Sequence, residues 1–158
     1  MIDSFGVAVM EMTNPQYLLA QLELLLRIGV AGVLGWMIGN ERKNRNKSAG
    51  TRTHSIVALG AALAMVVSKY GFQDMPDHDA ARVAAQVVSG VGFLGAGVIF
   101  VRNNLVNGLT TAAGIWATAS VGLAMGSGLY VIGIASALMI ILMQIFTHKI
   151  AYFARVAS

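Results

Sequence analysis

Long apolar segments, separated by short polar ones, run along most of the chain. Each apolar segment holds about 17–22 residues, and about 20 apolar residues in a helix are enough to cross the hydrocarbon core of a bilayer. The pattern therefore predicts an all-α, polytopic membrane helix bundle with about five transmembrane helices. The expected spans lie near residues 18–39, 54–69, 82–101, 109–125 and 129–147.

Residues that commonly begin and end helices bound these spans. Asn14-Pro15 predicts an N-cap and a first helical proline ahead of the first span. Pro76-Asp77 predicts the turn and cap before the third span. Gly126-Ser127-Gly128 predicts a tight turn, which makes the last two spans an antiparallel pair.

The composition supports a membrane protein with one domain. The chain has 158 residues, of which 56% are hydrophobic and 11% charged, with a mean hydropathy of +0.69. We expect a single transmembrane domain over residues 1–158. The chain has no cysteine, which excludes disulfides, thiolate metal sites and cysteine nucleophiles. The first residues lack a basic stretch and a cleavage site, so we expect the first span to act as its own insertion signal.

The charges are distributed unevenly along the chain and predict its orientation. One loop, residues 40–53, carries five of the eleven basic residues: Arg42, Lys43, Arg45, Lys47 and Arg52. Because cytoplasmic loops are enriched in Lys and Arg, we expect this loop inside, the N-terminus outside and the C-terminus in the cytoplasm. The outer segments then hold the acids Asp3, Glu11, Asp74, Asp77 and Asp79. A single basic loop also argues against nucleic acid as a partner, despite the net charge of +4.

Charged residues fall inside or at the mouth of two spans. Glu23 and Arg27 lie one turn apart in the first span, and Asp79 and Arg82 open the third. Gln86 shares a face with Asp79. Ionisable groups in a membrane suggest a cation, proton or small-molecule site between the first and third helices. The alternative is two ion pairs that fix helix register, or contact with a partner protein.

Small residues recur every four positions along three spans, which lets helix backbones approach closely in lipid. The stripes are Ala31, Gly35 and Gly39; Ala81, Ala85 and Ser89; and Thr110, Gly114, Thr118, Gly122 and Gly126. Four further glycines in the third span exceed what packing needs and could allow local unwinding. They are Gly90, Gly92, Gly95 and Gly97.

The segment between the first two spans is the second group of candidate residues. It contains Glu41, Arg42, Arg52, Thr53 and His54. One interpretation is topology control and attraction to anionic headgroups. The other is that Arg52 and His54 donate hydrogen bonds that hold the inner ends of several helices together.

Recognisable catalytic chemistry is missing from the sequence. The sequence has no HExxH motif, no His/Asp/Glu cluster with metal-ligand spacing and no Ser/His/Asp arrangement. The run GVGFLGAG lies inside an expected membrane helix, outside the strand–turn–helix context of a nucleotide site. We therefore expect no enzymatic activity and no cofactor, and the sequence assigns no metal.

Three segments together resemble the MgtC/SapB family of bacterial inner-membrane proteins. They are GWMIGNERKNRNKSAGTRTHSIVALGAAL, DAARVAAQVVSGVGFLGAGVIF and NGLTTAAGIWATASVGLAMGSGLY, in family order. The positions that match the family motifs are Glu41, Arg42, Gly50, Arg52, Thr53, Asp79, Arg82, Gln86, Gly90, Gly92, Phe93, Gly95, Gly97, Gly108, Leu109, Thr110, Thr111 and Trp116.

The resemblance implies a multi-pass protein of the bacterial inner membrane with a role in growth under magnesium limitation. Survival of pathogens in macrophages and inhibition of the F-type ATP synthase are associated with members that carry a soluble C-terminal domain. This chain resembles the short branch without that domain.

Two functions follow as expectations. The first is a non-enzymatic protein of adaptation to ionic stress, such as low magnesium or acid, that modulates membrane partners or ion balance. The second is a small oligomeric transporter or channel for a cation or small solute, with its site between Glu23, Arg27, Asp79, Arg82 and Gln86. The expected partners are the lipid bilayer, possible further copies of the chain and another membrane protein.

Overall fold

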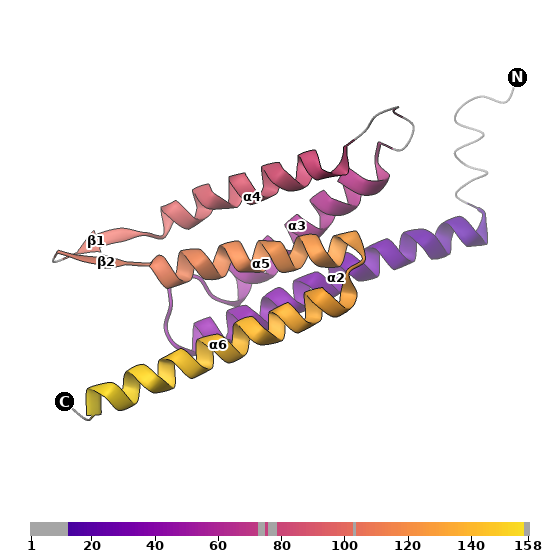
Figure 1. Cartoon of the computed structure of the whole chain (residues 1–158). Helices are drawn as coiled ribbons and strands as arrows, with labels where there is room; N and C mark the ends of the chain where they lie inside the picture. Colours follow the sequence, from indigo (N-terminus) through magenta and orange to yellow (C-terminus); the bar gives the residue numbers. More distant parts are fainter. Residues whose placement is uncertain (1–12, 73–74, 76–78, 103, 157–158) are drawn as a thin grey trace, which may run out of the picture.

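The computed structural model describes residues 13–72, 75, 79–102 and 104–156. Within them the chain forms five α-helices and one two-stranded hairpin (Figure 1). The elements are α2 (Pro15–Asn44), α3 (Thr51–Tyr70), α4 (Ala80–Gly97), β1 (Phe100–Arg102), β2 (Leu105–Asn107), α5 (Leu109–Ser127) and α6 (Tyr130–Val156). The expectations for the chain start, for Asp3, Glu11 and Asp74, and for the Pro76-Asp77 turn lie outside the described residues.

All five helices are long and apolar enough to cross a membrane. The predicted all-α membrane bundle is therefore confirmed.

The helix boundaries follow local sequence signals. The Asn14 side chain accepts a hydrogen bond from the Gln16 N–H at 3.0 Å, and Pro15 occupies the first turn of α2, as predicted. Gly128 ends α5 with φ of 91°, a left-handed conformation that glycine adopts without strain. The turn at Gly128 reverses the chain, so α5 and α6 run antiparallel (Figure 1).

The third span is shorter than predicted. α4 ends at Gly97 rather than near Val101, and the chain then forms an antiparallel hairpin in which Val101 pairs with Val106. Asn104 follows the first strand with φ of 57°, a conformation that asparagine tolerates better than most residues. The prediction of helix through residue 101 is therefore wrong.

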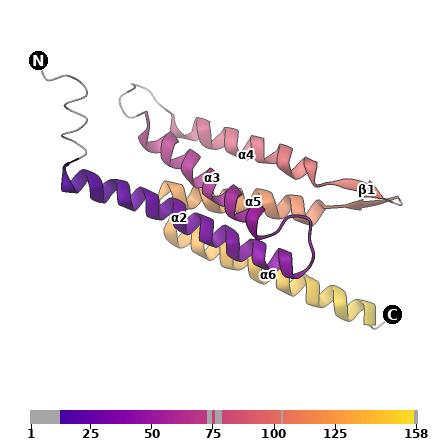
Figure 2. The ribbon, with the colours of Figure 1, turned by 180° about the vertical axis from the view of Figure 1, so that it is seen from behind.

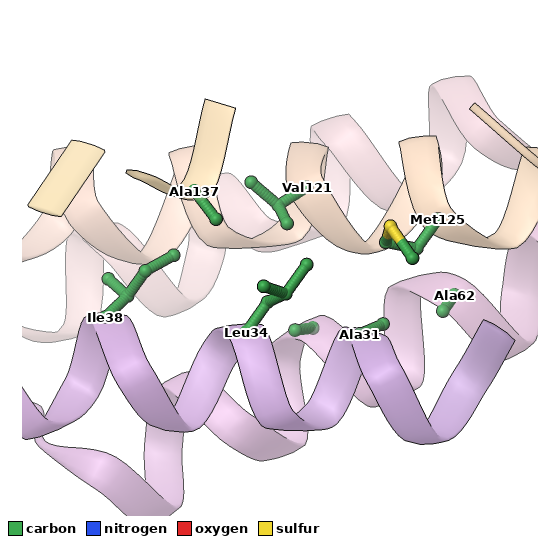
Figure 3. Packing of buried hydrophobic residues seen from close by; sticks show 8 residues of the cluster. Ala31, Leu34, Ile38, Ala62, Val121, Met125 and Ala137 are labelled. Carbon is green, nitrogen blue, oxygen red and sulfur yellow. The ribbon is translucent and has the colours of Figure 1, made fainter. Parts of the chain in front are cut away.

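Helix α5 lies at the centre of the bundle and contacts each of the other four helices. α4 lies at one edge and packs on α3 and α5 (Figures 1 and 2). The larger core cluster joins α2, α3, α5 and α6, with Leu34 and Ile38 of α2 facing Val121 and Ala137 (Figure 3). A second cluster around Ile115 and Val91 fastens α4 to the centre.

Two of the three small-residue stripes pack as predicted. A Cβ on Gly39 would lie 2.6 Å from the Gly50 carbonyl oxygen, and one on Gly126 would lie 2.9 Å from the Met65 Cβ. α3 therefore approaches α2 and α5 at backbone distance, which only small residues allow. Within the α5 stripe, Thr110 is exposed and its neighbour Thr111 is buried.

The third stripe behaves differently. Ala81, Ala85 and Ser89 are exposed, so this stripe is not buried inside the bundle, and close helix packing along it stays a prediction. α4 instead buries Val91 and Gly95, and Gly95 lies against Ala112 of α5. α4 is continuous from Ala80 to Gly97, so the local unwinding expected at its glycines is also wrong.

Candidate functional site

A polar cluster surrounds Arg27 where α2, α3 and α6 meet. The Arg27 guanidinium donates to the Glu23 carboxylate at 2.6 Å and to the Tyr70 hydroxyl at 2.9 Å. The Tyr130 hydroxyl donates to the same Glu23 oxygen at 2.7 Å. The rings of Tyr70 and Tyr130 also lie 5.7 and 5.4 Å from the Arg27 guanidinium carbon. We call these four residues the Arg27 cluster.

The Arg27 cluster ties together helices that are distant in sequence. The Arg27 side chain is 11% exposed and that of Glu23 is 56% exposed, so the arginine lies inside the bundle and the carboxylate at its edge. A partly buried guanidinium needs a charge partner and further acceptors to offset lost hydration. Glu23 and two tyrosines provide them, leaving only the Arg27 Nε without a partner among the described residues.

The other predicted members of this site lie elsewhere. Asp79 caps α4, where its carboxylate accepts from the Ala81 N–H at 2.8 Å. Arg82 and Gln86 are exposed and make no side-chain hydrogen bond or ion pair within the part of the chain that the structure describes. The structure thus brings Glu23 and Arg27 together but separates both from Asp79, Arg82 and Gln86. An ion site among these five residues stays a prediction.

A second charged group lies at the C-terminal end of α2. The Glu41 carboxylate accepts from Arg42 at 2.6 Å and from Arg45. Arg42 is buried, and its backbone carbonyl accepts from the Arg45 and Lys47 N–H groups in the following loop. The Glu41–Arg42–Arg45 group therefore fixes the path of the loop from α2 to α3.

Within the described residues, His54 is the one member of the second candidate group whose side chain makes a hydrogen bond to another helix. It is completely buried at the start of α3, and its Nδ1 lies 2.8 Å from the Thr118 hydroxyl of α5. The Thr118 hydroxyl donates its proton to the Gly114 carbonyl at 2.8 Å, so it accepts from His54. Neutral His54 is consequently the Nδ1–H tautomer, with a lone pair on Nε2. Arg52 and Thr53 are exposed, and the donor role of Arg52 stays a prediction.

Two side chains with a buried, unpartnered acceptor atom among the described residues border Gly114. A Cβ on Gly114 would lie 3.4 Å from the His54 ring and 3.6 Å from the Gln144 amide nitrogen, so both side chains border the same glycine. The His54 Nε2 and the Gln144 Oε1 are buried with no hydrogen-bond partner among the described residues. Each of these two atoms can accept a hydrogen bond. The two side chains bring α3 and α6 to the same glycine of α5.

The surface holds a broad hollow of about 640 Å³ between α2 and α6. Trp36, Asn40 and Glu41 line one side and Ile141 and Ile145 the other. Its only acid is Glu41, which Arg42 and Arg45 already engage. Across the described residues, His, Asp and Glu side chains form no group of three that could hold a metal ion.

Sequence reasoning missed several residues of these groups. Tyr70 and Tyr130 lie at helix ends, where aromatic residues are common in membrane proteins, and this position could have suggested them as partners for Arg27. Gln144 stands alone as an amide in an apolar span, which is itself a signal. The packing of Thr118 on His54 depends on how α3 and α5 cross, and spacing along the chain does not encode that.

Relatives of this chain occur among characterised and uncharacterised bacterial proteins. "Putative magnesium transporter YhiD" of Escherichia coli K12 is 48% identical over 135 residues, 82% of this chain and 63% of that protein. "Protein SapB" of Bacillus subtilis is 40% identical over 126 residues, 76% of this chain and 54% of that protein. "Protein MgtC" of Brucella abortus is 50% identical over 99 residues, 63% of this chain and 40% of that protein. No solved structure matches.

The chain thus spans less than two thirds of the length of these relatives. A comparison with protein families matches residues 28–153 to the family described as "MgtC family". This segment includes the His54–Thr118 contact, the Glu41–Arg42–Arg45 group and all of α3, α4 and α5. Together with the five membrane-crossing helices, this match shows that the chain is a multi-pass membrane protein that belongs to the MgtC family.

Proposed function

We propose that this protein is a non-enzymatic component of the bacterial inner membrane that serves adaptation to ionic stress, such as low magnesium or acid. It acts by modulating other membrane proteins or ion balance. Its N-terminus lies outside and its C-terminus in the cytoplasm.

The observation that carries the proposal is that the partly buried Arg27 and the buried Arg42 are bound by other side chains of the bundle, with only the Arg27 Nε left without a partner among the described residues. Arg27 is bound by Glu23 and Tyr70, and Arg42 by Glu41. A transport site needs ligand atoms that can release one partner and take another, whereas paired charges fix helix positions. The arrangement favours a rigid bundle that presents its surface to partners.

The relatives support the link to ions. One bears a name that includes "magnesium transporter". That name belongs to a protein of which this chain covers 63%, so the connection to magnesium is part of the proposal here.

Growth and flux measured on the same variants test the proposal. A strain lacking its own family members should grow poorly at limiting magnesium and recover when it expresses this chain. Purified protein in vesicles containing a magnesium-sensitive dye should leave Mg²⁺ entry at the rate of empty vesicles. Recovery of growth together with protein-dependent Mg²⁺ entry would overturn the modulator assignment, and failure to restore growth would remove the role in magnesium limitation.

The YhiD name favours one alternative, a small transporter or channel for a cation. Transport would use the predicted residues Glu23, Arg27, Asp79, Arg82 and Gln86, of which the last three are free of ion pairs within the described residues. Vesicle flux that Asp79→Asn abolishes, while the thermal stability stays unchanged, would support this alternative. Flux that persists in Asp79→Asn would remove Asp79 from any pathway.

A further inference from the structure

Helix α4 has a low hydropathy for a span that is so little buried inside the bundle. α4 and α5 have the lowest mean hydropathy of the five spans. Half of the α5 span is buried inside the bundle, but only 11% of the α4 span is. α6 is also little buried, yet it is the most apolar span and suits contact with lipid. In a single copy of the chain, α4 is therefore the least buried span and at the same time one of the two least apolar ones.

The polar residues of α4 and its N-cap, continued by two apolar residues, form a seam on the side away from the bundle. Successive spacings of three and four residues place them on one face, the pattern of a helix that packs against another helix. The seam consists of Asp79, Arg82, Gln86, Ser89, Phe93 and Ala96. Val91, on the opposite face, packs into the core. Every seam residue is exposed, and Phe93 is 82% exposed.

A neighbouring helix would find open space along the same side of α4. A Cβ added to Gly90 or Gly97 would meet no atom within 4 Å. Beside the seam, Gly60, Gly90 and Leu94 border a shallow apolar groove of about 330 Å³ between α3 and α4. A neighbouring helix could therefore approach the α4 backbone closely, with a large side chain in the groove.

The charged and polar side chains of the seam can pair with the same side chains of a second copy. Asp79 and Arg82 lie on the same turn and are not paired with each other in the described structure. In two parallel copies related by a two-fold axis along the membrane normal, equal residues lie at equal depth, so each Arg82 can reach the other Asp79. The Gln86 amide is both donor and acceptor, so two facing copies satisfy each other. A different partner would need its own complementary charges, whereas a second copy already has them.

We propose that α4 is the interface of a parallel homodimer. The Asp79 and Arg82 pairs lie at one end of the interface, the Gln86 pair lies inside the membrane, and Phe93 of each copy packs into the other's groove at Gly90. The pairing removes the exposed Gln86 amide from lipid, where unpaired polar groups are costly.

Disulfide mapping in native membranes tests the interface, because the chain has no cysteine of its own. We expect Ser89→Cys to form a disulfide-linked dimer under mild oxidation. Val88→Cys is the matched control: it lies at the same depth on α4, but points about 100° away. Val33→Cys, exposed on α2, reports any pairing through another face.

Each outcome decides the matter. A dimer from Ser89→Cys and not from the two controls supports the proposal. A dimer from Val33→Cys alone, no dimer from any variant, or an adduct of Ser89→Cys with a different protein would overturn it.

A second variant tests the contribution of the amide while the helix stays intact. Gln86→Leu should extend the apolar surface of α4 without disturbing the bundle, since the exposed Gln86 side chain makes no hydrogen bond within the described residues. We expect its dimer dissociation constant in detergent to rise roughly tenfold, the size of a hydrogen bond in a membrane, while Gln86→Asn keeps most of the affinity. Equal affinity of Gln86→Leu and wild type would place the interface elsewhere.

Discussion

At the scale of the residue, the polar groups of this protein act mainly as connectors between helices. Arg27 reaches from α2 to Tyr70 of α3, and Tyr130 of α6 binds the Glu23 partner of the same arginine. Ser55 donates to the Gly32 carbonyl at 2.8 Å, again joining α3 to α2. In a bilayer, where apolar surfaces gain little by meeting each other, such hydrogen bonds contribute to helix association. Each also fixes one register between two helices.

The His54–Thr118 contact gives a direct test of this role. Thr118→Val keeps the shape of the side chain but removes the hydroxyl that accepts from His54, leaving a buried N–H unpaired. Such a loss costs about 1–3 kcal/mol. We therefore expect a lower midpoint of thermal unfolding in detergent. Thr118→Ser, which retains the hydroxyl, should stay close to wild type; an unchanged midpoint in Thr118→Val would show that the hydrogen bond adds nothing.

At the scale of the element, the apolar pattern predicted the number of helices and most of their positions. Caps at Asn14 and the turn at Gly128 were predictable because both depend on residues adjacent in sequence. The hairpin after α4 was missed because Phe100 and Val101 extend the apolar run of the third span. The Asn103-Asn104 pair between two short β-prone segments was the signal that could have revealed it.

The small-residue stripes show where sequence alone reaches its limit. A stripe predicts that a helix will pack closely, but not which neighbour it meets. The α2 and α5 stripes meet α3 inside the chain. The α4 stripe is exposed in a single copy, and the proposed dimer would place a second copy beside it. Likewise, Asp79 and Arg27 were expected to meet because they lie at similar depth, but only the helix arrangement determines lateral neighbours.

A pair of glycines in α2 tests the packing of this helix on α3. Gly35→Ala would place a Cβ 2.8 Å from the Ala58 Cβ, forcing the two helices apart. Overpacking of this kind costs about 1–3 kcal/mol. Gly29→Ala, in the same helix, meets no atom within 4 Å and gains about 0.5–1 kcal/mol from helix propensity. We expect opposite shifts in the thermal midpoint; a shift of the same sign in both variants would contradict the observed α2–α3 contact.

At the scale of the whole molecule, the basic residues are concentrated at one end of the bundle. The α2–α3 loop, the hairpin and the C-terminal end of α6 lie at one end (Figures 1 and 2). The bases at that end are Arg42, Lys43, Arg45, Lys47, Arg52, Arg102 and Lys149. The Arg27 cluster and Asp79 lie toward the other end, where Lys69 binds the Ser127 carbonyl at 2.9 Å. One end of the bundle is thus strongly basic, which is the distribution that sets membrane orientation.

The orientation itself can be measured by thiol labelling, again because the chain lacks cysteine. Ser48→Cys lies exposed in the α2–α3 loop, and Phe72→Cys lies just beyond α3 at the opposite end. Since basic loops are retained in the cytoplasm, a membrane-impermeant maleimide added to intact spheroplasts should label Phe72→Cys and leave Ser48→Cys unlabelled. Ser48→Cys should react once detergent opens the membrane, which shows that its thiol is accessible in the folded protein. The reverse pattern would invert the orientation, and labelling of both variants in intact spheroplasts would contradict a single orientation in the membrane.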